Sequence, residues 1–324
     1  MNLKLLIGLS FITIISCDSS IGIAPDKTQN DTYDSIQDYP KDDSAISEEE
    51  IEDVEEQEEI ETLTDFSQPG PYEISGESKS ANVTNCPNMN YDVYFPTEVI
   101  NPPSVILGHG FARGPDSMVG WANHLSSWGV EVILPTLCHY NVFAGVDHEM
   151  NGRNMTELIN IHGSTDVVYA GHSAGGLAAV IAASIDLNAL GVLGLDTTDT
   201  QDIPGIPDLL GQQYAGNMVS PGFSIMGEPS SCNAENNGLA LFRIMDGYQA
   251  IKITDADHCD FENPTDWICE SQCENQNQNY SDEEIRSTIT LFGTAAIMSL
   301  TELSPDGITT WEESSNIEIV QELE

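Results

Sequence analysis

The segment VVYAGHSAGGLAAVIAAS, residues 167–184, contains a Gly-x-Ser-x-Gly motif centred on Ser173. Glycines on both sides of this serine allow a strained turn that neighbouring backbone crowds. The residues DVVYA, 166–170, before the motif are typical of a buried strand, and the Gly- and Ala-rich residues after it are typical of a helix. Because a strand–turn–helix context distinguishes a nucleophile from an ordinary turn serine, we expect Ser173 to be a catalytic nucleophile.

A serine hydroxyl becomes a good nucleophile only when a base takes its proton, and His258 is the candidate base. In the chain order that accompanies such a motif, the serine comes first, then the acid, then the histidine. Of the seven histidines, only His258 follows Ser173. It lies in ITDADHCDF, directly after the last predicted strand, where a loop presents it at the edge of the sheet. His172 adjoins the serine, but adjacent side chains diverge, so we expect it to point away.

Three carboxylates are candidates for the acid that holds the imidazole by a hydrogen bond and stabilises the imidazolium. Asp196 ends the predicted strand LGVLGLD, and Glu228 ends the next one, GFSIMGE. Asp199 follows shortly after Asp196. A position at a strand end permits either of the first two, so the residue pattern alone leaves the identity of the acid open.

The motif LGHGF, residues 107–111, ends another predicted strand. A loop in this place supplies one backbone N–H to a developing oxyanion, here that of Phe111. The residue after the nucleophile, Ala174, supplies the second N–H. His109 and Gly110 then shape the turn. The alternative is an ordinary glycine turn with no catalytic role.

Apolar runs alternate with helical stretches from about residue 70 onward. The runs, rich in Val and Ile, cover residues 91–95, 104–110, 130–135, 166–171, 189–196, 222–227 and 248–254. The predicted helices cover residues 116–128, 151–161, 174–185, 237–246 and 281–303, the last capped by Ser281. Runs that are apolar throughout are typical of strands covered on both faces. The alternation therefore predicts an α/β domain with a mainly parallel sheet flanked by helices on both faces.

The motifs GHGF, GHSAGG, GLD and ADH resemble those of the α/β-hydrolase superfamily, and the resemblance covers roughly residues 85–303. More narrowly, they resemble the branch of platelet-activating-factor acetylhydrolases, chlorophyllases and poly(ethylene terephthalate)-hydrolase-like esterases. The resemblance implies the α/β-hydrolase fold, cleavage of carboxylic esters and no cofactor. It also implies that the acid is Asp196, 23 residues beyond Ser173, and that Phe111 donates to the oxyanion.

Residues 1–17 have the features of an export signal. Lys4 precedes about eleven mostly apolar residues, a run too short to span a bilayer. The ending Ile-Ile-Ser-Cys resembles a bacterial lipobox, in which the cysteine, here Cys17, becomes the lipidated first residue of the mature chain. The alternative is cleavage of a plain signal peptide nearby. We expect a lipoprotein of the bacterial cell envelope or a secreted protein.

The distribution of acidic residues divides the rest of the chain into segments and excludes some classes of binding partner. The net charge is −44, and residues 18–69 contain 18 acids against two lysines, which predicts a disordered, self-repelling tether. We expect the catalytic domain at residues 70–303 and a peripheral acidic C-terminal tail at 304–324. Residues 70–324 carry 35 acids against six Lys and Arg, a surface that repels nucleic acid and anionic membranes. The expected membrane contact is the lipid at Cys17 alone.

Six cysteines remain after Cys17, an even number that in an exported chain predicts up to three disulfides. They are Cys86, Cys138, Cys232, Cys259, Cys269 and Cys273. Fifteen connectivities are possible, and the spacing of Cys269 and Cys273 allows a local bridge. We expect no metal, because neither a Cys-x-x-Cys nor a His-x3-His pair is present, and DADHCDFE lacks the glycine and spacing of a calcium loop.

These residues together predict a monomeric serine hydrolase in which Ser173 attacks an ester and His258 and Asp196 complete a triad. One alternative is a non-catalytic surface-binding protein on the same fold, against which the complete set of serine, histidine and acid argues. The other is a peptidase or amidase of the same fold, which often carries a propeller or a large cap domain. About 25 residues separate Asp196 from the next predicted strand, room for a small lid at most.

Overall fold

A computed structural model describes residues 63–141, 145–203, 205–273 and 278–323, which belong to one compact unit beginning at Ile60. The predicted signal peptide with Cys17, and the predicted tether as far as residue 62, lie outside the described residues. None of the helices in the described ranges combines the length and the hydropathy needed to cross a membrane.

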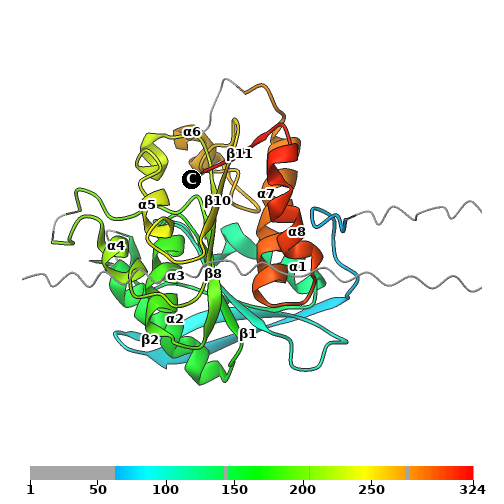
Figure 1. The fold of residues 1–324 in the computed structure, drawn as a ribbon. Coiled ribbons are helices and arrows are strands. Elements are labelled where there is room, and N and C mark those ends of the chain that lie inside the picture. Colours follow the sequence, from blue (N-terminus) through cyan, green and yellow to red (C-terminus); the bar gives the residue numbers. More distant parts are fainter. Residues whose placement is uncertain (1–62, 142–144, 204, 274–277, 324) are drawn as a thin grey trace, which may run out of the picture. The chain divides into compact units, whose positions relative to one another are not determined.

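A large sheet of nine strands forms the centre of the described part of the chain (Figure 1). The strands are β1 (Ile74–Val83), β2 (Cys86–Pro96), β3 (Ser104–Gly108), β4 (Glu131–Pro135), β7 (Val167–His172), β8 (Ala189–Leu195), β9 (Gly222–Met226), β10 (Gln249–Ile253) and β11 (Val320–Glu322). Their order is β1-β2-β4-β3-β7-β8-β9-β10-β11. The short strands β5 (Tyr140–Asn141) and β6 (Gly145–Val146) pair separately.

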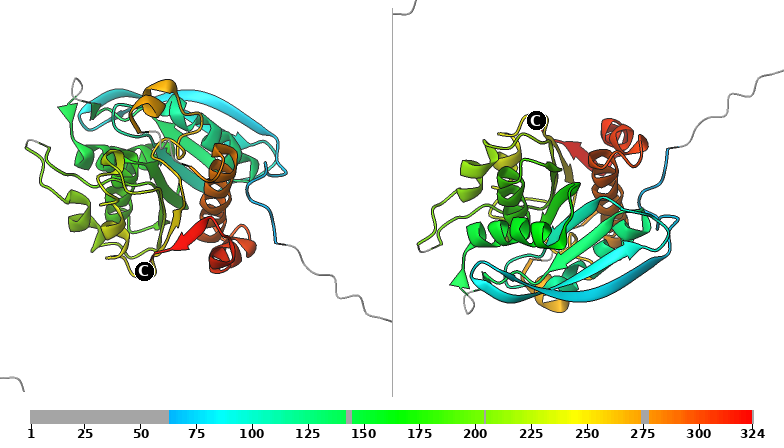
Figure 2. Two further views of the ribbon diagram at one scale, coloured as in Figure 1. Left: turned by 90° about the horizontal axis from the view of Figure 1, so that it is seen from above. Right: turned by 90° about the horizontal axis from the view of Figure 1, so that it is seen from below.

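Six neighbouring strands of the sheet, β4, β3, β7, β8, β9 and β10, are parallel to one another. The strands β1, β2 and β11 pair antiparallel with their neighbours. Figure 2 shows the β1–β2 pair, in cyan, and β11, in red, at opposite ends of this sheet. The chain is therefore a mixed α/β protein with a large, mostly parallel sheet, as the apolar runs predict.

Helices cover both faces of the sheet (Figure 1). The helices are α1 (Val119–Ser127), α2 (His148–His162), α3 (Ala174–Ile185), α4 (Leu210–Ala215), α5 (Leu239–Phe242), α6 (Trp267–Cys273), α7 (Asp282–Leu300) and α8 (Asp306–Glu312). Helices α1, α7 and α8 pack on one face, and α2, α3, α4 and α5 pack on the other. Helix α7 begins at the predicted cap: the Ser281 hydroxyl accepts from the Glu284 N–H, and Glu284 accepts from the Ser281 N–H.

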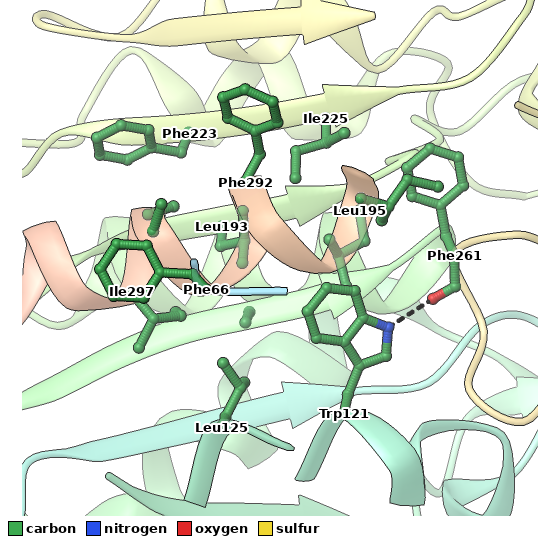
Figure 3. Packing of buried hydrophobic residues seen from close by; sticks show 14 of the residues in the cluster. Phe66, Trp121, Leu125, Leu193, Leu195, Phe223, Ile225, Phe261, Phe292 and Ile297 are labelled. Atoms are coloured by element: carbon green, nitrogen blue, oxygen red, sulfur yellow. Dashed lines mark hydrogen bonds between the residues drawn. The ribbon is translucent and has the colours of Figure 1, made fainter. Parts of the chain in front are cut away.

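Alternating residues of each strand supply the two cores. In β3, Val105 and Leu107 face the α1–α7–α8 layer, and Ile106 faces the α2–α5 layer. Figure 3 shows the first layer, where Trp121 of α1 donates its indole N–H to the carbonyl of Phe261 at 2.9 Å. The central parallel strands β3, β7, β8 and β9 are almost entirely apolar because both of their faces are buried.

The chain changes direction in the sheet between β3 and β7. From β3 it proceeds through α1 to β4 on one side, and α2 then carries it back across to β7 on the other side. Gly108, the last residue of β3, is the register partner of Gly171, the residue before the last of β7. At such a switch point the loops after the two strands diverge and leave a crevice at the carboxyl ends, where α/β proteins bind ligands.

Two expectations about the ends of the globular part are wrong. Residues 304–324 are not a peripheral tail, because they form α8 and β11, and Trp311 lies in the core. The globular part also begins before residue 70, because Phe66 is fully buried against the ring of Trp128 at 5.0 Å between centroids. Both segments are mainly polar, and Phe66 and Trp311 are buried through contacts with other elements of the chain.

The six cysteines form three disulfides: Cys86–Cys138, Cys232–Cys273 and Cys259–Cys269. The predicted number is confirmed, but the local Cys269–Cys273 bridge is wrong. Both residues lie in α6, where side chains four residues apart lean in the same direction and do not point at each other.

We predict that Trp311→Ala lowers the free energy of unfolding by about 3–5 kcal/mol, because it opens a cavity between α7, α8 and β9. The Trp311 ring packs edge-on against Phe223 and Phe292, and its N–H donates to the Phe292 carbonyl at 2.9 Å. Urea unfolding of the full chain measures the loss. The exposed neighbour Glu312, changed to Ala, is the control and should alter stability by less than about 0.5 kcal/mol. Equal effects of the two substitutions would contradict the core role of the C-terminal segment.

Candidate active site

Ser173 lies in a sharp turn between β7 and α3, with φ 55° and ψ −123°. Two glycines permit this turn: a Cβ on Gly171 would lie 2.3 Å from the backbone of Gly175, and a Cβ on Gly175 would lie 2.3 Å from the carbonyl oxygen of Gly108. The positive φ and the crowding are the features that the Gly-x-Ser-x-Gly pattern predicts. The turn brings the serine to the switch point of the sheet, at the start of helix α3.

The second part of the site is a buried pair of His258 and Asp196. The Nδ1–H of His258, in the loop after β10, donates to Oδ2 of Asp196 at 2.6 Å. Asp196 follows the last residue of β8, and no part of it reaches solvent. With Nδ1 protonated, Nε2 of His258 is left with a lone pair that can take a proton.

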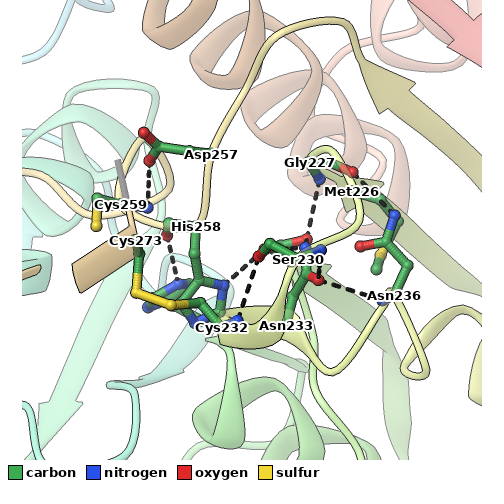
Figure 4. A network of polar contacts seen from close by, with 12 residues as sticks. Met226, Gly227, Ser230, Cys232, Asn233, Asn236, Asp257, His258, Cys259 and Cys273 are labelled. Atoms are coloured by element: carbon green, nitrogen blue, oxygen red, sulfur yellow. Dashed lines mark hydrogen bonds and ion pairs between the residues drawn. A yellow bond between two sulfur atoms is a disulfide. The ribbon is translucent and has the colours of Figure 1, made fainter. Parts of the chain in front are cut away.

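Asp196 is held by further hydrogen bonds that the sequence pattern did not indicate. Its Oδ1 accepts from the Gly227 N–H at 2.9 Å, and the Asn233 amide donates to Oδ1 and Oδ2 at 3.3 and 3.1 Å. Asn233 is itself fixed, because its Oδ1 accepts from the N–H groups of Ser230 and Asn236. Figure 4 shows Asn233 at the centre of this network, beside His258. The buried carboxylate therefore keeps one orientation.

The other two candidate acids lie away from His258. Glu228 forms an ion pair with Lys252 at 2.9 Å. Asp199 accepts through Oδ1 from the N–H groups of Thr200 at 2.7 Å and Gly211 at 2.8 Å. Of the three carboxylates, only Asp196 forms a hydrogen bond with the imidazole in the described part of the chain.

Ser173 lies between two cavities. The first has a volume of about 290 Å³, and both Ser173 and His258 line it. The second, of about 350 Å³, lies on the side of Ala174 and Leu177. Ser173, Phe111 and Cys232 line both cavities, so a ligand that extends from one into the other passes the serine hydroxyl.

Two backbone N–H groups belong to residues that line the second cavity together with Ser173. Phe111 follows β3 and Ala174 is the first residue of α3, and both line the cavities at Ser173. Within the described ranges neither N–H donates a hydrogen bond. The N–H of Ala174 lies at the N-terminus of α3, a place that favours negative charge, and the free N–H of Phe111 is a second donor for an anionic oxygen.

His172 does not point away from the site, contrary to the expectation. It lines the first cavity, and its ring lies 4.5 Å from that of His258, centroid to centroid. Its Nε2–H donates to the His258 carbonyl at 3.0 Å. Burial, reinforced by repulsion from His258, holds the pKa of His172 well below its usual range. The neutral ring of His172 therefore supports the loop that carries His258.

An ion pair joins the loop of Phe111 to the loop of His258. Arg113 donates twice to Glu262 at 2.6 Å and once to Asp266 at 3.1 Å. The Glu262 side chain is fully buried. The sequence holds a signal for Arg113, which is one of few cations after residue 70 and follows LGHGF. The sequence does not indicate which of the many acids is its partner.

Two disulfides lie at the first cavity. Cys259 follows His258 and bonds to Cys269 of α6. Cys232 precedes Asn233 and bonds to Cys273 (Figure 4). The sulfurs of Cys259, Cys269 and Cys273 lie within 4.8 Å of one another. All three are in disulfides and so lack the thiolate that binds a metal.

Comparison with models of known protein families and with curated protein sequences gave no match.

We predict that His109, which must stay neutral in the folded chain, by itself contributes a loss of stability of roughly 3 kcal/mol as the pH drops from 6.5 to 4. Its Nε2 accepts from the Leu137 N–H at 3.1 Å, and its Nδ1–H donates to the Gly110 carbonyl at 3.0 Å. Burial lowers its pKa to about 4, against 6.5 when unfolded, so within this window the unfolded chain binds the additional proton.

Urea unfolding across the same pH range tests this expectation. His109→Gln, which cannot take up the proton, should show a smaller loss of stability between pH 6.5 and 4. An equally steep loss in this variant would assign the pH dependence to other groups.

Proposed function

We propose that this protein is an exported serine hydrolase of the α/β-hydrolase fold that cleaves carboxylic esters. The observation that carries the proposal is the buried hydrogen bond of 2.6 Å between His258 and Asp196, next to a cavity that His258 shares with Ser173. A strained serine, a neutral imidazole and a fixed carboxylate are the set that activates a hydroxyl.

In this reaction Nε2 of His258 takes the proton of the Ser173 hydroxyl as its oxygen attacks the ester carbonyl. Asp196 stabilises the imidazolium that forms and keeps the proton of Nδ1 in place. The N–H groups of Phe111 and Ala174 donate to the oxygen that becomes negative in the tetrahedral intermediate.

The intermediate collapses when the bond between the carbonyl carbon and the alcohol oxygen breaks. His258 gives its proton to the departing alcohol, and the acyl group remains on Ser173. Water then attacks the acyl carbon while His258 takes a proton from it. The bond between the acyl carbon and the Ser173 oxygen breaks, His258 returns the proton to that oxygen, and the carboxylic acid leaves. This chemistry needs no cofactor, because every proton moves through His258.

Further features support an ester substrate outside the cell. The resemblance of the motifs is to a branch that consists mostly of esterases, and apolar residues such as Phe111 and Leu177 line the cavities. Three disulfides are typical of exported proteins. We therefore propose a monomer in the bacterial cell envelope, anchored through a lipid on Cys17, or secreted, with no role in binding nucleic acid.

The first test is hydrolysis of p-nitrophenyl esters with acyl chains of two to sixteen carbons by the full chain. We expect activity that Ser173→Ala lowers by roughly 10⁴-fold or more, because the nucleophile is lost. A fluorophosphonate probe should label the original chain and not the variant. Correctly oxidised, folded protein that neither cleaves these esters nor reacts with the probe would refute the proposal in favour of a binding protein.

Substitution of the acids tests the assignment of Asp196. Asp196→Asn keeps the shape but offers an amide to Nδ1 of His258, and we expect a loss in kcat of about 10⁴-fold. Glu228→Gln is the matched control, because its carboxylate pairs with Lys252, and its kcat should stay within about threefold of the original. The reverse ranking would make Glu228 the acid.

A further inference from the structure

Apolar residues that reach solvent border the first cavity. Phe111 and Ala112, in the loop after β3, and Ile268 of α6 line this cavity together with Ser173 and His258. Phe111 is 41% exposed, Ile268 is 44% exposed, and Ala112 is also exposed. Because these three residues both line the cavity and reach solvent, they lie at its edge.

Trp267, the first residue of α6, extends this apolar edge. It is 74% exposed and directly precedes Ile268. An ion pair of 3.1 Å between Arg113 and Asp266 joins the loop after β3 to the start of α6. Arg113 directly follows Ala112, and Asp266 directly precedes Trp267. The exposed apolar residues of the two segments therefore lie close together, and we call them the apolar rim: Phe111, Ala112, Trp267 and Ile268.

The helix that carries half of the apolar rim is fixed to its neighbours. Two disulfides attach α6 to the loop of His258 and to the segment of Asn233. The backbone therefore holds Trp267 and Ile268 at the surface beside the first cavity. Large apolar side chains that are exposed together are typical of a surface that contacts another apolar surface.

The charges near the apolar rim disfavour an anionic partner. The guanidinium of Arg113 is already paired with Glu262 and Asp266. The seven residues of α6 include the acid Glu270 and no cation. Residues 70–324 carry 35 acids against six Lys and Arg. Because like charges repel, the rim is suited to an uncharged apolar surface and not to an anionic membrane.

The second cavity indicates which uncharged surface fits. Its walls are mainly apolar and include Val146, Leu177 and Ile203. If the proposed function is correct, and this inference rests on it, such walls suit an apolar acyl chain. Esters of apolar acyl chains with an uncharged alcohol such as glycerol dissolve poorly in water and gather in droplets. The phase that holds such a substrate is therefore both uncharged and apolar.

We infer that the apolar rim docks this protein on droplets of uncharged acyl esters such as triacylglycerols. Trp267 and Ile268 enter the droplet surface, and the first cavity then faces the ester phase. A substrate molecule passes from the droplet to Ser173 without first dissolving in water. The acids around the rim exclude droplets whose surface is anionic.

The test measures adsorption of the chain to trioctanoylglycerol droplets by flotation. All forms carry Ser173→Ala, so that no ester is consumed, and consist of residues 18–324 without the predicted lipid, which would itself bind droplets. We expect Trp267→Ser to weaken adsorption by at least about 10-fold, because the indole no longer leaves water. Leu187→Ser is the matched control: Leu187 is 76% exposed, between α3 and the start of β8, and adsorption should stay within about twofold.

Trp267 also reports docking directly. Trp121 and Trp311 are each 3% exposed, and Trp128 is partly buried against the core. Trp267 is therefore the most exposed of the four tryptophans. We expect droplets to shift its fluorescence to shorter wavelengths and to protect it from quenching by acrylamide. Both changes should be absent in Trp267→Ser.

The outcomes separate this inference from the function on which it rests. If the chain cleaves p-nitrophenyl esters but does not adsorb, or if Trp267→Ser and Leu187→Ser adsorb equally, docking through the rim is refuted and the esterase stands. Adsorption that is as tight when phosphatidylglycerol is added to the droplets would indicate a membrane partner and also refute the inference. If the chain adsorbs but neither cleaves esters nor reacts with the fluorophosphonate probe, the proposed function falls, and with it the droplet as a source of substrate.

Discussion

The charge of Asp196 sets the demands that the surrounding loops must meet. A carboxylate removed from solvent is stable only when hydrogen bonds replace the water it has lost. Gly227 and Asn233 supply these bonds from the segment after β9, and His258 from the segment after β10. If any of these loops moved, the carboxylate would lose a donor. The geometry of the site is therefore tied to the stability of the carboxyl end of the sheet.

Covalent and ionic cross-links hold those segments together. The Cys232–Cys273 and Cys259–Cys269 bridges attach the segments of Asn233 and His258 to the same short helix, α6. The pair of Arg113 and Glu262 attaches the loop of Phe111 to the loop of His258. Loops alone have little packing to fix them, so cross-links at these points restrict the positions that the site residues can take. The rigid sheet beneath supplies the common frame.

Surface composition and core packing give different information about this chain. In the described part of the chain most acids lie at the surface, yet the acidic C-terminal segment contributes Trp311 to the core and β11 to the sheet. The apolar strands were predictable because two buried faces require apolar residues at every position. Strand β1, with mostly exposed residues at the sheet edge, and β11, with three residues, lack this pattern and were not predicted. Helices α4, α6 and α8 were also not predicted, because seven residues or fewer are too short to show a helical pattern of apolar residues.

The sequence by itself determined the features that depend on residues close together in the chain. The turn at Ser173 follows from glycines two residues away on either side, and the place of His258 follows from its being the last histidine. Only the tertiary structure decided which carboxylate meets that histidine, which cysteines pair, and that Arg113 binds Glu262. These contacts join segments far apart in the chain, and many acids and six cysteines satisfy the same local pattern. The choice among them is made by the packing of the loops over the sheet.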